Sequence, residues 1–329
     1  MSERSGEFGL IRRHFARRVA PNDKVLLGIG DDCALLRAPL QGQVLAVSSD
    51  MLVEGHHFLA DADPASIGHK SLAVNLSDLA AMGAEPLGFT LAIALPRIDD
   101  AWLDAYCDGL FALAQRADCP LVGGDTTRGP LCVSITVFGQ VPPDEALRRS
   151  GARPGDDLWI SGPLGGAAFA VAARAAQRSV PADAARRLDW PEPRLELGRA
   201  LRGLASAAID VSDGLAGDLS HLLEASACAG ARIELARLPI APALDTLPRV
   251  ERASDIDNGP VPERLRFALD GGDDYELLFT ARPAARTAID ALAQGSSRIG
   301  SVSAEVGILL STPDGSKHRW RPASFDHFR

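Results

Sequence analysis

Short stretches in which aspartate stands beside glycine or serine recur along the chain, and they hold the residues most able to do chemistry. Glycine lets the backbone turn sharply and approach a ligand, while serine and aspartate supply hard oxygen ligands. Any one such stretch is typical of an ordinary turn, because Asp and Gly are common turn residues. Five of them at the ends of apolar segments, with one further acid inside a predicted helix, predict instead that carboxylates gather in one pocket. These acids are Asp31, Asp32, Asp50, Asp78, Asp125, Asp210, Asp213, Asp273 and Asp274.

Carboxylates that converge within a few ångströms repel one another unless cations lie between them. The candidate ligands are all oxygen donors, and no His/Cys cluster has the spacing of a zinc site. The pattern therefore favours Mg²⁺ or another hard divalent cation. A polyphosphate is the usual partner of several such ions, and an acidic pocket binds an anionic nucleotide only with metal between them. This chemistry predicts MgATP as the ligand.

The familiar nucleotide-binding motifs are missing from the sequence. There is no GxxxxGK[ST], GIGDDC fails GxGxxG at its last position, and no HRD or DFG set occurs. The turn GPLGG at residues 162–166 precedes a predicted helix and could hold phosphate at its N-terminus. Packing of a strand against a helix is the simpler interpretation of that turn.

The first half of the chain alternates short apolar runs with helical stretches, which predicts an α/β fold. Residues 66–82 are expected to form a helix capped by Ser66, on which Ser71, Asn75 and Asp78 make a polar stripe at i, i+4 and i+7. The other predicted elements are a helix over 100–116 and strands over 24–29, 44–48, 88–95, 120–122 and 132–139.

The second half repeats this alternation after a stretch around Ser150 in which Pro, Gly and charged residues concentrate. Such a stretch is typical of a linker, so we expect domains over residues 1–149 and 150–329. Residues 251–263 are expected to form a surface loop. Predicted strands cover 157–161 and 231–235, and predicted helices cover 167–178, 184–188, 194–205 and 219–227.

The composition is that of a globular protein of 329 residues, of which 46% are hydrophobic and 23% charged. No apolar run approaches the roughly 20 residues of a membrane-spanning helix, and the N-terminal segment lacks the apolar core of a signal peptide. The formal net charge of −9 argues against a nucleic-acid-binding face. Five cysteines form no CxxC pair, which favours free thiols in a reducing compartment. We therefore expect a cytoplasmic protein that binds neither membrane nor nucleic acid.

Seven motifs follow one another in a specific order: GIGDDCALL, SSDMLVEGHHF, KSLAVNLSDLAAMGAEP, GGDTTRGP, RSGARPGD, AIDVSDGL and DGGDDYELLFT. Through them the chain resembles the bacterial thiamine-monophosphate kinase family over nearly its whole length. The first three acidic motifs, in looser form, also fit the wider superfamily of aminoimidazole-ribotide synthetase. The resemblance implies two α/β domains. The N-terminal domain would bind metal and nucleotide and pair its mixed sheet with a second subunit in a dimer barrel, and the C-terminal domain would complete the active site.

The same resemblance implies an activity: direct, Mg²⁺-dependent transfer of the γ-phosphoryl group of ATP to thiamine monophosphate, giving thiamine diphosphate and ADP. The acceptor is itself a phosphate whose second pKa is about 6, so at pH 7 it is mostly a ready nucleophile and needs no catalytic protein base. The obstacle is the repulsion between two polyanions, which Mg²⁺ and Arg149 would neutralise.

Site residues follow from the resemblance motif by motif. Asp273 departs from the family pattern GGEDYEL, in which Glu stands at this place, so the substrate contact could run through water or shift to Asp274. Because neighbouring side chains of a strand alternate, one of the two serines could ligate through its carbonyl. The implied Mg²⁺ ligands are Asp31, Ser48, Ser49, Asp50, Asp78, Asp125, Asp210 and Asp213; the ATP contacts are Gly124, Asp125, Arg149 and Ser212; the substrate contacts are His57, Asp273 and Phe325.

Three other functions fit part of the pattern. Another ATP-dependent enzyme of the superfamily would share the nucleotide site but use a different acceptor. A metal-dependent phosphohydrolase would release phosphate from ATP without needing thiamine monophosphate. A non-enzymatic metal-binding module would form no thiamine diphosphate under any condition.

Overall fold

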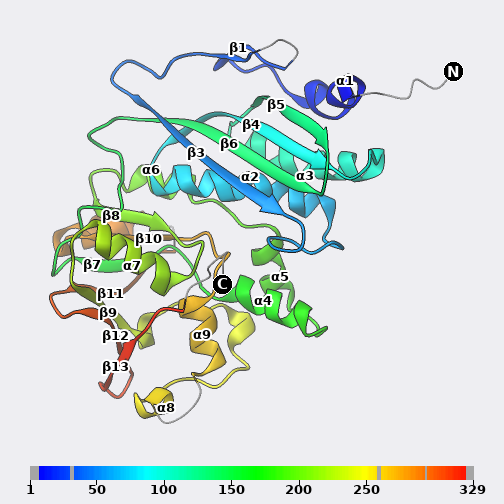
Figure 1. The fold of residues 1–329 in the computed structure, drawn as a ribbon. Coiled ribbons are helices and arrows are strands. Elements are labelled where there is room, and N and C mark those ends of the chain that lie inside the picture. Colours follow the sequence, from blue (N-terminus) through cyan, green and yellow to red (C-terminus); the bar gives the residue numbers. More distant parts are fainter. Residues whose placement is uncertain (1–6, 30–32, 258–260, 293–294, 324–329) are drawn as a thin grey trace. The chain divides into compact units, whose positions relative to one another are not determined.

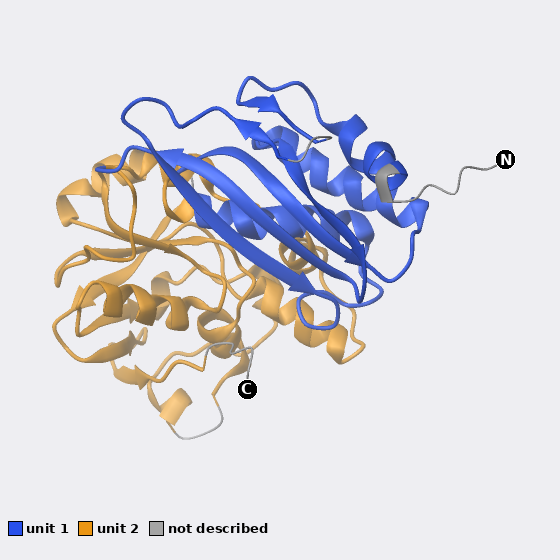
Figure 2. Cartoon of the chain, turned by 45° about the horizontal axis from the view of Figure 1, so that its top comes forward, with its two compact units in different colours: residues 1–79, 84–144 blue, residues 80–83, 145–329 orange. Residues whose placement is uncertain are grey.

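The computed structural model describes residues 7–29, 33–257, 261–292 and 295–323 (Figure 1). The predicted ligand Asp31, its neighbour Asp32 and the predicted substrate contact Phe325 lie outside these residues. The chain forms two compact units, which Figure 2 colours separately. Unit 1 comprises residues 1–79 and 84–144, and unit 2 comprises residues 80–83 and 145–329.

Unit 1 is built on a four-stranded mixed sheet. Its strands are β3 (Val44–Val53), β4 (Glu85–Leu95), β5 (Leu121–Arg128) and β6 (Cys132–Val141), in the order β3-β6-β4-β5. β6 pairs antiparallel with β3 and β4, while β5 runs parallel to β4. In the described part of the chain β3 and β5 are therefore the two edges of this sheet.

Helices α2 (Pro64–Ala81) and α3 (Asp100–Arg116) pack against each other through two glycines. A Cβ atom on Gly68 would lie 1.9 Å from the Tyr106 carbonyl oxygen, and one on Gly109 would lie 1.8 Å from that of Ala65. Such distances leave no room for a side chain, so both positions require glycine. Leucines of α2 at helical spacing are buried: Leu72, Leu76 and Leu79.

The predicted cap at Ser66 is wrong, because α2 begins two residues earlier at Pro64. Proline favours the first position of a helix, where its missing N–H would have no partner in any case. The Asp63 side chain accepts a hydrogen bond from the Ala65 N–H at 3.2 Å, and the Ser66 hydroxyl donates to the Asp63 carbonyl at 2.8 Å. Asp63 thus does the capping that the sequence analysis assigned to Ser66.

The N-terminal segment of unit 1 is tied to α3 by ion pairs. It comprises α1 (Glu7–Leu10), η1 (Ile11–Phe15), η2 (Ala16–Arg18) and the hairpin of β1 (Val25–Leu27) with β2 (Leu35–Leu36). The buried imidazole of His14 lies 2.9 Å from Asp100 and 3.1 Å from Asp104 through its two ring nitrogens. The strand predicted over 24–29 is present as the shorter β1.

Unit 2 is built on a seven-stranded sheet in the order β13-β12-β9-β11-β7-β10-β8. Both faces of the inner strand β7 are covered: Leu158 and Ile160 pack into one core cluster, and Trp159 into another. The strands are β7 (Asp157–Ile160), β8 (Ala205–Asp210), β9 (Gly230–Glu234), β10 (Leu277–Ala281), β11 (Ser297–Ser303), β12 (Gly307–Ser311) and β13 (Lys317–Trp320). The mixed α/β class predicted from the sequence is confirmed.

Several helices of unit 2 differ from the prediction. The helix expected over 219–227 begins earlier, at Leu215. The helix expected over 194–205 ends at Ala200, because β8 already begins at Ala205. The loop expected over 251–263 contains a short helix, α8 (Ser254–Asp257). The other helices are α4 (Gly166–Ala175), α5 (Ala182–Asp189), α6 (Leu195–Ala200), α7 (Leu215–Ala225), α9 (Glu263–Asp270) and α10 (Arg286–Ala291), with the 3₁₀ turns η3 (Leu235–Arg237), η4 (Pro242–Leu244) and η5 (Pro283–Ala285).

The sequence pattern suggested that the acidic residues follow the ends of strands, but two of them do not. Asp50 lies within β3, which continues to Val53, and Asp125 lies within β5, which continues to Arg128. Both strands are edges of the sheet of unit 1. Polar residues are tolerated inside edge strands because part of such a strand faces solvent.

Gly124 is predicted to be indispensable for the edge strand β5. Its φ is +146°, and a Cβ atom there would lie 1.8 Å from the Leu91 carbonyl oxygen. Gly124→Ala should therefore lower the free energy of unfolding by about 2–5 kcal/mol, from strain and overpacking. At the neighbouring Gly123 a Cβ atom would meet only Thr90, at 4.0 Å. Gly123→Ala should change stability by about 1 kcal/mol or less, and equal urea midpoints for the two variants would contradict this account.

Candidate nucleotide and metal site

Three of the predicted residues meet where β3 faces α2 in unit 1. The Ser48 hydroxyl donates to the Asp78 carboxylate at 2.5 Å, and the Asp50 N–H donates to the Asn75 side-chain carbonyl at 3.0 Å. Ser48 and Asp50 are two residues apart on one strand, so their side chains point to the same face. Ser48, Asp50 and Asp78 are all half-buried there. The structure thus brings two carboxylates and a hydroxyl to one face of the sheet.

The polar stripe of α2 is what orients this group. Asn75 is fully buried, and its amide nitrogen donates to the Ser71 carbonyl at 3.0 Å while its oxygen accepts from Asp50. The Ser71 hydroxyl in turn lies 3.1 Å from that of Tyr106 on α3. Each polar member of the stripe is therefore held by hydrogen bonds, as buried polar groups generally are.

Ser49 and Asp125 are placed apart from that group. The Ser49 hydroxyl donates to the Ile135 carbonyl at 3.1 Å and lies 3.0 Å from the Thr136 hydroxyl, on the exposed face of the sheet. Asp125 lies on the edge strand β5, opposite the edge that carries Asp50, and pairs with Ala92 of the inner strand β4. Three inter-strand spacings separate these edges, or about 14 Å. Since Mg²⁺ holds its ligands at about 2.1 Å, one ion cannot bridge Asp50 and Asp125 of the same chain.

The predicted substrate contact His57 is held by the end of β3. Its Nδ1 accepts a hydrogen bond from the Val53 N–H at 3.0 Å. A ring nitrogen that accepts cannot carry a proton, so the proton of the neutral imidazole lies on Nε2. The His57 side chain is half-buried and its neighbour His56 is exposed.

In unit 2 the two acidic turns predicted from the sequence lie side by side. The Asp273 N–H donates to the Ser212 carbonyl at 2.9 Å, and the Tyr275 N–H donates to the Val211 carbonyl at 2.8 Å. Asp273 and Tyr275 both have positive φ, +66° and +48°. Such backbone conformations are unfavourable for residues other than glycine and concentrate at functional sites. Asp210, Ser212, Asp213 and Asp273 are therefore neighbours.

The turn at 210–214 concentrates negative charge. Asp210 is 5% exposed at the end of β8, and Asp218, on the first turn of α7, is 3% exposed. Burial, and then the charges of Asp210 and Asp213, raise the pKa of Asp218 to about 7. Acidic side chains around one turn repel one another, and a cation bound nearby would offset that repulsion.

Asp274 is the alternative to Asp273 for the predicted substrate contact. It is buried, one carboxylate oxygen accepts from the Gly165 N–H at 2.8 Å, and the other has no hydrogen-bond partner among the described residues. Burial raises the pKa of Asp274 to about 8. The Gly165 N–H belongs to the GPLGG turn, which is thereby used for packing within unit 2.

Glu276 anchors the same region through two arginines. It is 2% exposed, pairs with Arg194 at 2.6 and 2.7 Å and with Arg187 at 3.3 Å, and accepts from the Ser161 hydroxyl at 2.5 Å. Arg187 also donates to the Pro163 carbonyl of the GPLGG turn at 3.1 Å. A buried carboxylate held by this many partners is assigned a structural role.

The predicted ATP contact Arg149 lies at the start of unit 2 with an exposed side chain. Its carbonyl accepts from the Ser226 hydroxyl at 2.9 Å, and the carbonyl of the preceding Arg148 accepts from the Ala208 N–H of β8 at 2.8 Å. The backbone of this segment is thus positioned while the guanidinium faces solvent.

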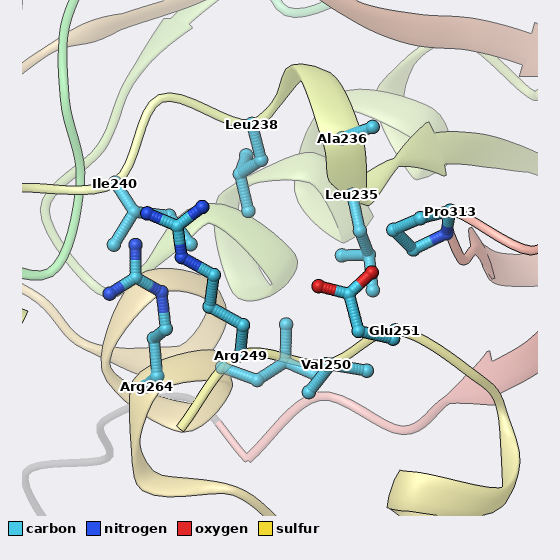
Figure 3. Close-up of a pocket in the computed structure, with 10 residues that line it drawn as sticks. Leu235, Ala236, Leu238, Ile240, Arg249, Val250, Glu251, Arg264 and Pro313 are labelled. Carbon is cyan, nitrogen blue, oxygen red and sulfur yellow. The ribbon is translucent and has the colours of Figure 1, made fainter. Parts of the chain in front are cut away.

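A cavity of about 430 Å³ in unit 2 contains none of the predicted site residues (Figure 3). Two arginines lie in its wall. Arg264 is 9% exposed and is tied to the Leu244 carbonyl and, at 3.0 Å, to Asp245, which explains it as a structural residue. The lining residues are Leu235, Ala236, Leu238, Ile240, Arg249, Val250, Glu251, Arg264, Leu265 and Pro313.

Within residues 7–29, 33–257, 261–292 and 295–323 no group of three or more His, Cys, Asp or Glu side chains is close enough to hold a metal by itself. The predicted ligands are instead distributed in pairs and turns whose oxygens fit hard cations. The same residues contain no helix long and apolar enough to cross a membrane.

The sequence analysis missed two residues that support these groups. Asn75 was recognised only as part of a stripe, although its position four residues after Ser71 already placed it on the face with Asp78. Asp218 was not singled out, although an acid in the first turn of a helix, five residues after Asp213, is typical of a side chain that binds backbone N–H groups.

Asp274 is predicted to make stability depend on pH. Burial raises the pKa of Asp274 from its ordinary 3.8 to about 8 in the fold. The folded state therefore binds the proton more tightly than the unfolded chain, and stability falls as pH rises from about 4 to 8. Asp274→Asn mimics the neutral acid and should remove this decline, which is at most about 1.4 kcal/mol per pH unit. Urea unfolding from pH 5 to 8 measures this decline, with the exposed Asp183→Asn as control. If the free energy of unfolding depends on pH in the same way in wild type and Asp274→Asn, the prediction is wrong.

Comparisons with known proteins agree with the described fold. Residues 30–141 match the AIR synthase related protein, N-terminal domain family. The chain is 46% identical to the thiamine-monophosphate kinase of Salmonella typhimurium over 332 residues, covering 98% of each chain. The crystal structure of thiamine-monophosphate kinase from Stenotrophomonas maltophilia superposes with a TM-score of 0.82 at 42% identity, covering 93% of this chain and 96% of that one. The AaThiL structure complexed with AMPPCP and TMP gives a TM-score of 0.75 at 25% identity, covering 89% and 90%. The chain belongs to the thiamine-monophosphate kinase family.

Proposed function

We propose that this chain transfers the γ-phosphoryl group of ATP to thiamine monophosphate, giving thiamine diphosphate and ADP. The observation that carries the proposal is 46% identity to a thiamine-monophosphate kinase over 98% of both chains. It is supported by a related structure that holds AMPPCP and TMP together. Transfer between two substrates requires that one protein bind both.

The residues of this chain would bind and orient the two substrates. Ser212 is the proposed nucleotide contact in unit 2, on a turn hydrogen-bonded to the turn of Asp273, the proposed substrate contact. His57 would present Nε2–H to the substrate, since its Nδ1 is occupied by Val53. The acceptor phosphate is mostly dianionic at pH 7, so transfer proceeds directly, without a protein base or a phosphorylated residue.

Mg²⁺ is the proposed cofactor. The oxygens of Ser48, Asp50 and Asp78 in unit 1, and of Asp210 and Asp213 in unit 2, fit it by type and charge. Ser48 would act by its side chain, since its hydroxyl already lies 2.5 Å from Asp78. When bound, the ions supply positive charge between the two polyanionic substrates. Asp31, Ser49 and Asp125 complete the proposed ligand set, with Gly124 and Arg149 as further ATP contacts and Phe325 against the substrate.

We also propose a homodimer formed through the sheet of unit 1. The exposed face of β3 carries Leu45, Val47 and Met51, which are 51%, 55% and 55% exposed. A row of apolar side chains on an edge strand is unfavourable in water and is usually covered by a partner. A second copy joined edge to edge would also place its own Asp125 near β3 of the first copy. Asp50 of one copy and Asp125 of the other would then be neighbours.

A cytoplasmic location fits this chemistry, because the reaction consumes ATP. The five cysteines are all unpaired, as thiols remain in a reducing compartment.

Incubation with MgATP and thiamine monophosphate, followed by chromatography of the products, tests the function. We expect thiamine diphosphate and ADP in equal amounts, and no phosphorylated protein in rapid-quench samples.

Asp78→Asn removes charge at nearly constant volume, so turnover should fall by about 100-fold or more while the unfolding midpoint changes little. The exposed Asp144→Asn is the control. Phosphate release from ATP without thiamine monophosphate would indicate a phosphohydrolase instead, and ADP release only with another acceptor would indicate a sister enzyme.

The homodimer is tested by light scattering coupled to gel filtration. The wild type should elute as a dimer, and Val47→Glu should shift it to a monomer with reduced activity, because a buried glutamate at the interface has no partner. Val171→Glu, on an exposed position of α4, should leave the dimer intact. A monomeric wild type at micromolar concentration, or a dimeric Val47→Glu, would overturn the proposal.

A further inference from the structure

The turn that joins β8 to α7 is held from both sides by hydrogen bonds. On one side the Ser212 carbonyl accepts from the Asp273 N–H at 2.9 Å. On the other side the Asp218 carboxylate accepts from the Asp213 N–H at 3.1 Å. The turn is also forced through Gly214, whose φ is +111° and where a Cβ atom would lie 2.7 Å from the Asp270 backbone. Its conformation is therefore closely determined.

Asp218 reaches this turn from the first turn of α7. Its own N–H donates to the Gly214 carbonyl at 3.0 Å, so its backbone is part of the helix while its side chain bends back over the N-terminus. Helix N-termini favour negative side chains and leave backbone N–H groups in need of acceptors. Loss of this acceptor would leave the Asp213 N–H without its partner in a site where Asp218 itself is only 3% exposed.

A carboxylate is electrostatically unfavourable as the acceptor for this backbone N–H. The charged neighbours that act most strongly on Asp218 are both negative, Asp210 and Asp213. An asparagine in its place could accept a hydrogen bond without adding repulsion to the cluster. Three carboxylates around one turn repel one another, and a cation bound beside them would offset that repulsion.

We infer that Asp218 is a positioning residue for the metal- and nucleotide-binding turn. It fixes the backbone that presents the Ser212 hydroxyl and the Asp213 carboxylate, and it adds a third negative charge that strengthens the binding of divalent cations there. The inference rests on the proposed function, which assigns Ser212 to ATP and Asp210 and Asp213 to Mg²⁺. Groups that support ligating residues in this way affect metal affinity or activity by about 10- to 100-fold.

Two substitutions separate the charge of Asp218 from its hydrogen bonds. Asp218→Asn keeps one acceptor oxygen at the same volume but removes the charge. We expect the Mg²⁺ concentration for half-maximal thiamine diphosphate formation to rise by about tenfold, with kcat at saturating Mg²⁺ within about threefold of wild type. Asp218→Ala removes the acceptor as well, so kcat should fall by about 10- to 100-fold even at saturating Mg²⁺.

A binding measurement without turnover accompanies the kinetics. Mn²⁺ binding to the nucleotide-free full chain, followed by the electron paramagnetic resonance signal of free Mn²⁺, should weaken in Asp218→Asn. The matched control is Glu224→Gln, which removes one charge from the exposed far end of α7. It should leave the Mg²⁺ dependence, the Mn²⁺ affinity and kcat at wild-type values.

The outcomes distinguish this inference from the proposed function. A wild type that forms no thiamine diphosphate refutes the function, whatever the variants do. An active wild type whose Asp218→Asn variant matches Glu224→Gln in Mg²⁺ dependence and Mn²⁺ affinity refutes the role of Asp218. A variant Asp218→Asn that fails to fold, or that only lowers the unfolding midpoint, would assign Asp218 to stability and also overturn the inference.

Discussion

Repulsion between carboxylates is the interaction on which the structure around the acidic residues of each unit depends. In unit 1, Asp78 of α2 faces the side of β3 that carries Asp50. In unit 2, Asp218 of α7 contacts the turn that carries Asp210 and Asp213. Like charges at such separations are unfavourable without cations. The chain keeps them in place by tying the backbone around them: Asn75 binds the Asp50 N–H, and Asp218 binds the Asp213 N–H.

Rigid supports of this kind explain why the acids lie on strands and at strand–helix turns. The two buried glycines between α2 and α3 hold the polar stripe of α2 at a fixed distance from α3. In unit 2, two residues with positive φ are maintained because the turn of Asp273 is hydrogen-bonded to the turn of Ser212. Strain at these positions is balanced by the surrounding hydrogen bonds and packing. A site that must align two polyanions benefits from such preorganisation.

The separation of Asp50 from Asp125 connects the site to the proposed dimer. Asp50 and Asp125 lie on opposite edge strands of one four-stranded sheet. The same edge strand that carries Asp50 exposes apolar side chains on its other face. Both observations have one explanation if a second copy joins the edge strand β3 and covers its exposed apolar side chains. The chemistry and the association of the chain then depend on the same four strands.

The sequence by itself determined the α/β class, the long helices of unit 1 and the family. Periodicity placed the helix over 100–116 where α3 is found, because its apolar positions repeat at helical spacing. It also identified Ser71, Asn75 and Asp78 as one stripe. The predictions for Asp31 and Phe325, which lie outside the described residues, rest on the resemblance.

Only the tertiary structure decided which acids are neighbours. Asp50 and Asp125 looked alike in sequence, each beside small residues, yet strand order separates them by three spacings. Asp218 carried no motif of its own, and its importance arises from a hydrogen bond to Asp213. Strand order and the return of a helix onto its own preceding turn depend on contacts between distant segments. Local patterns of residue type do not contain that information.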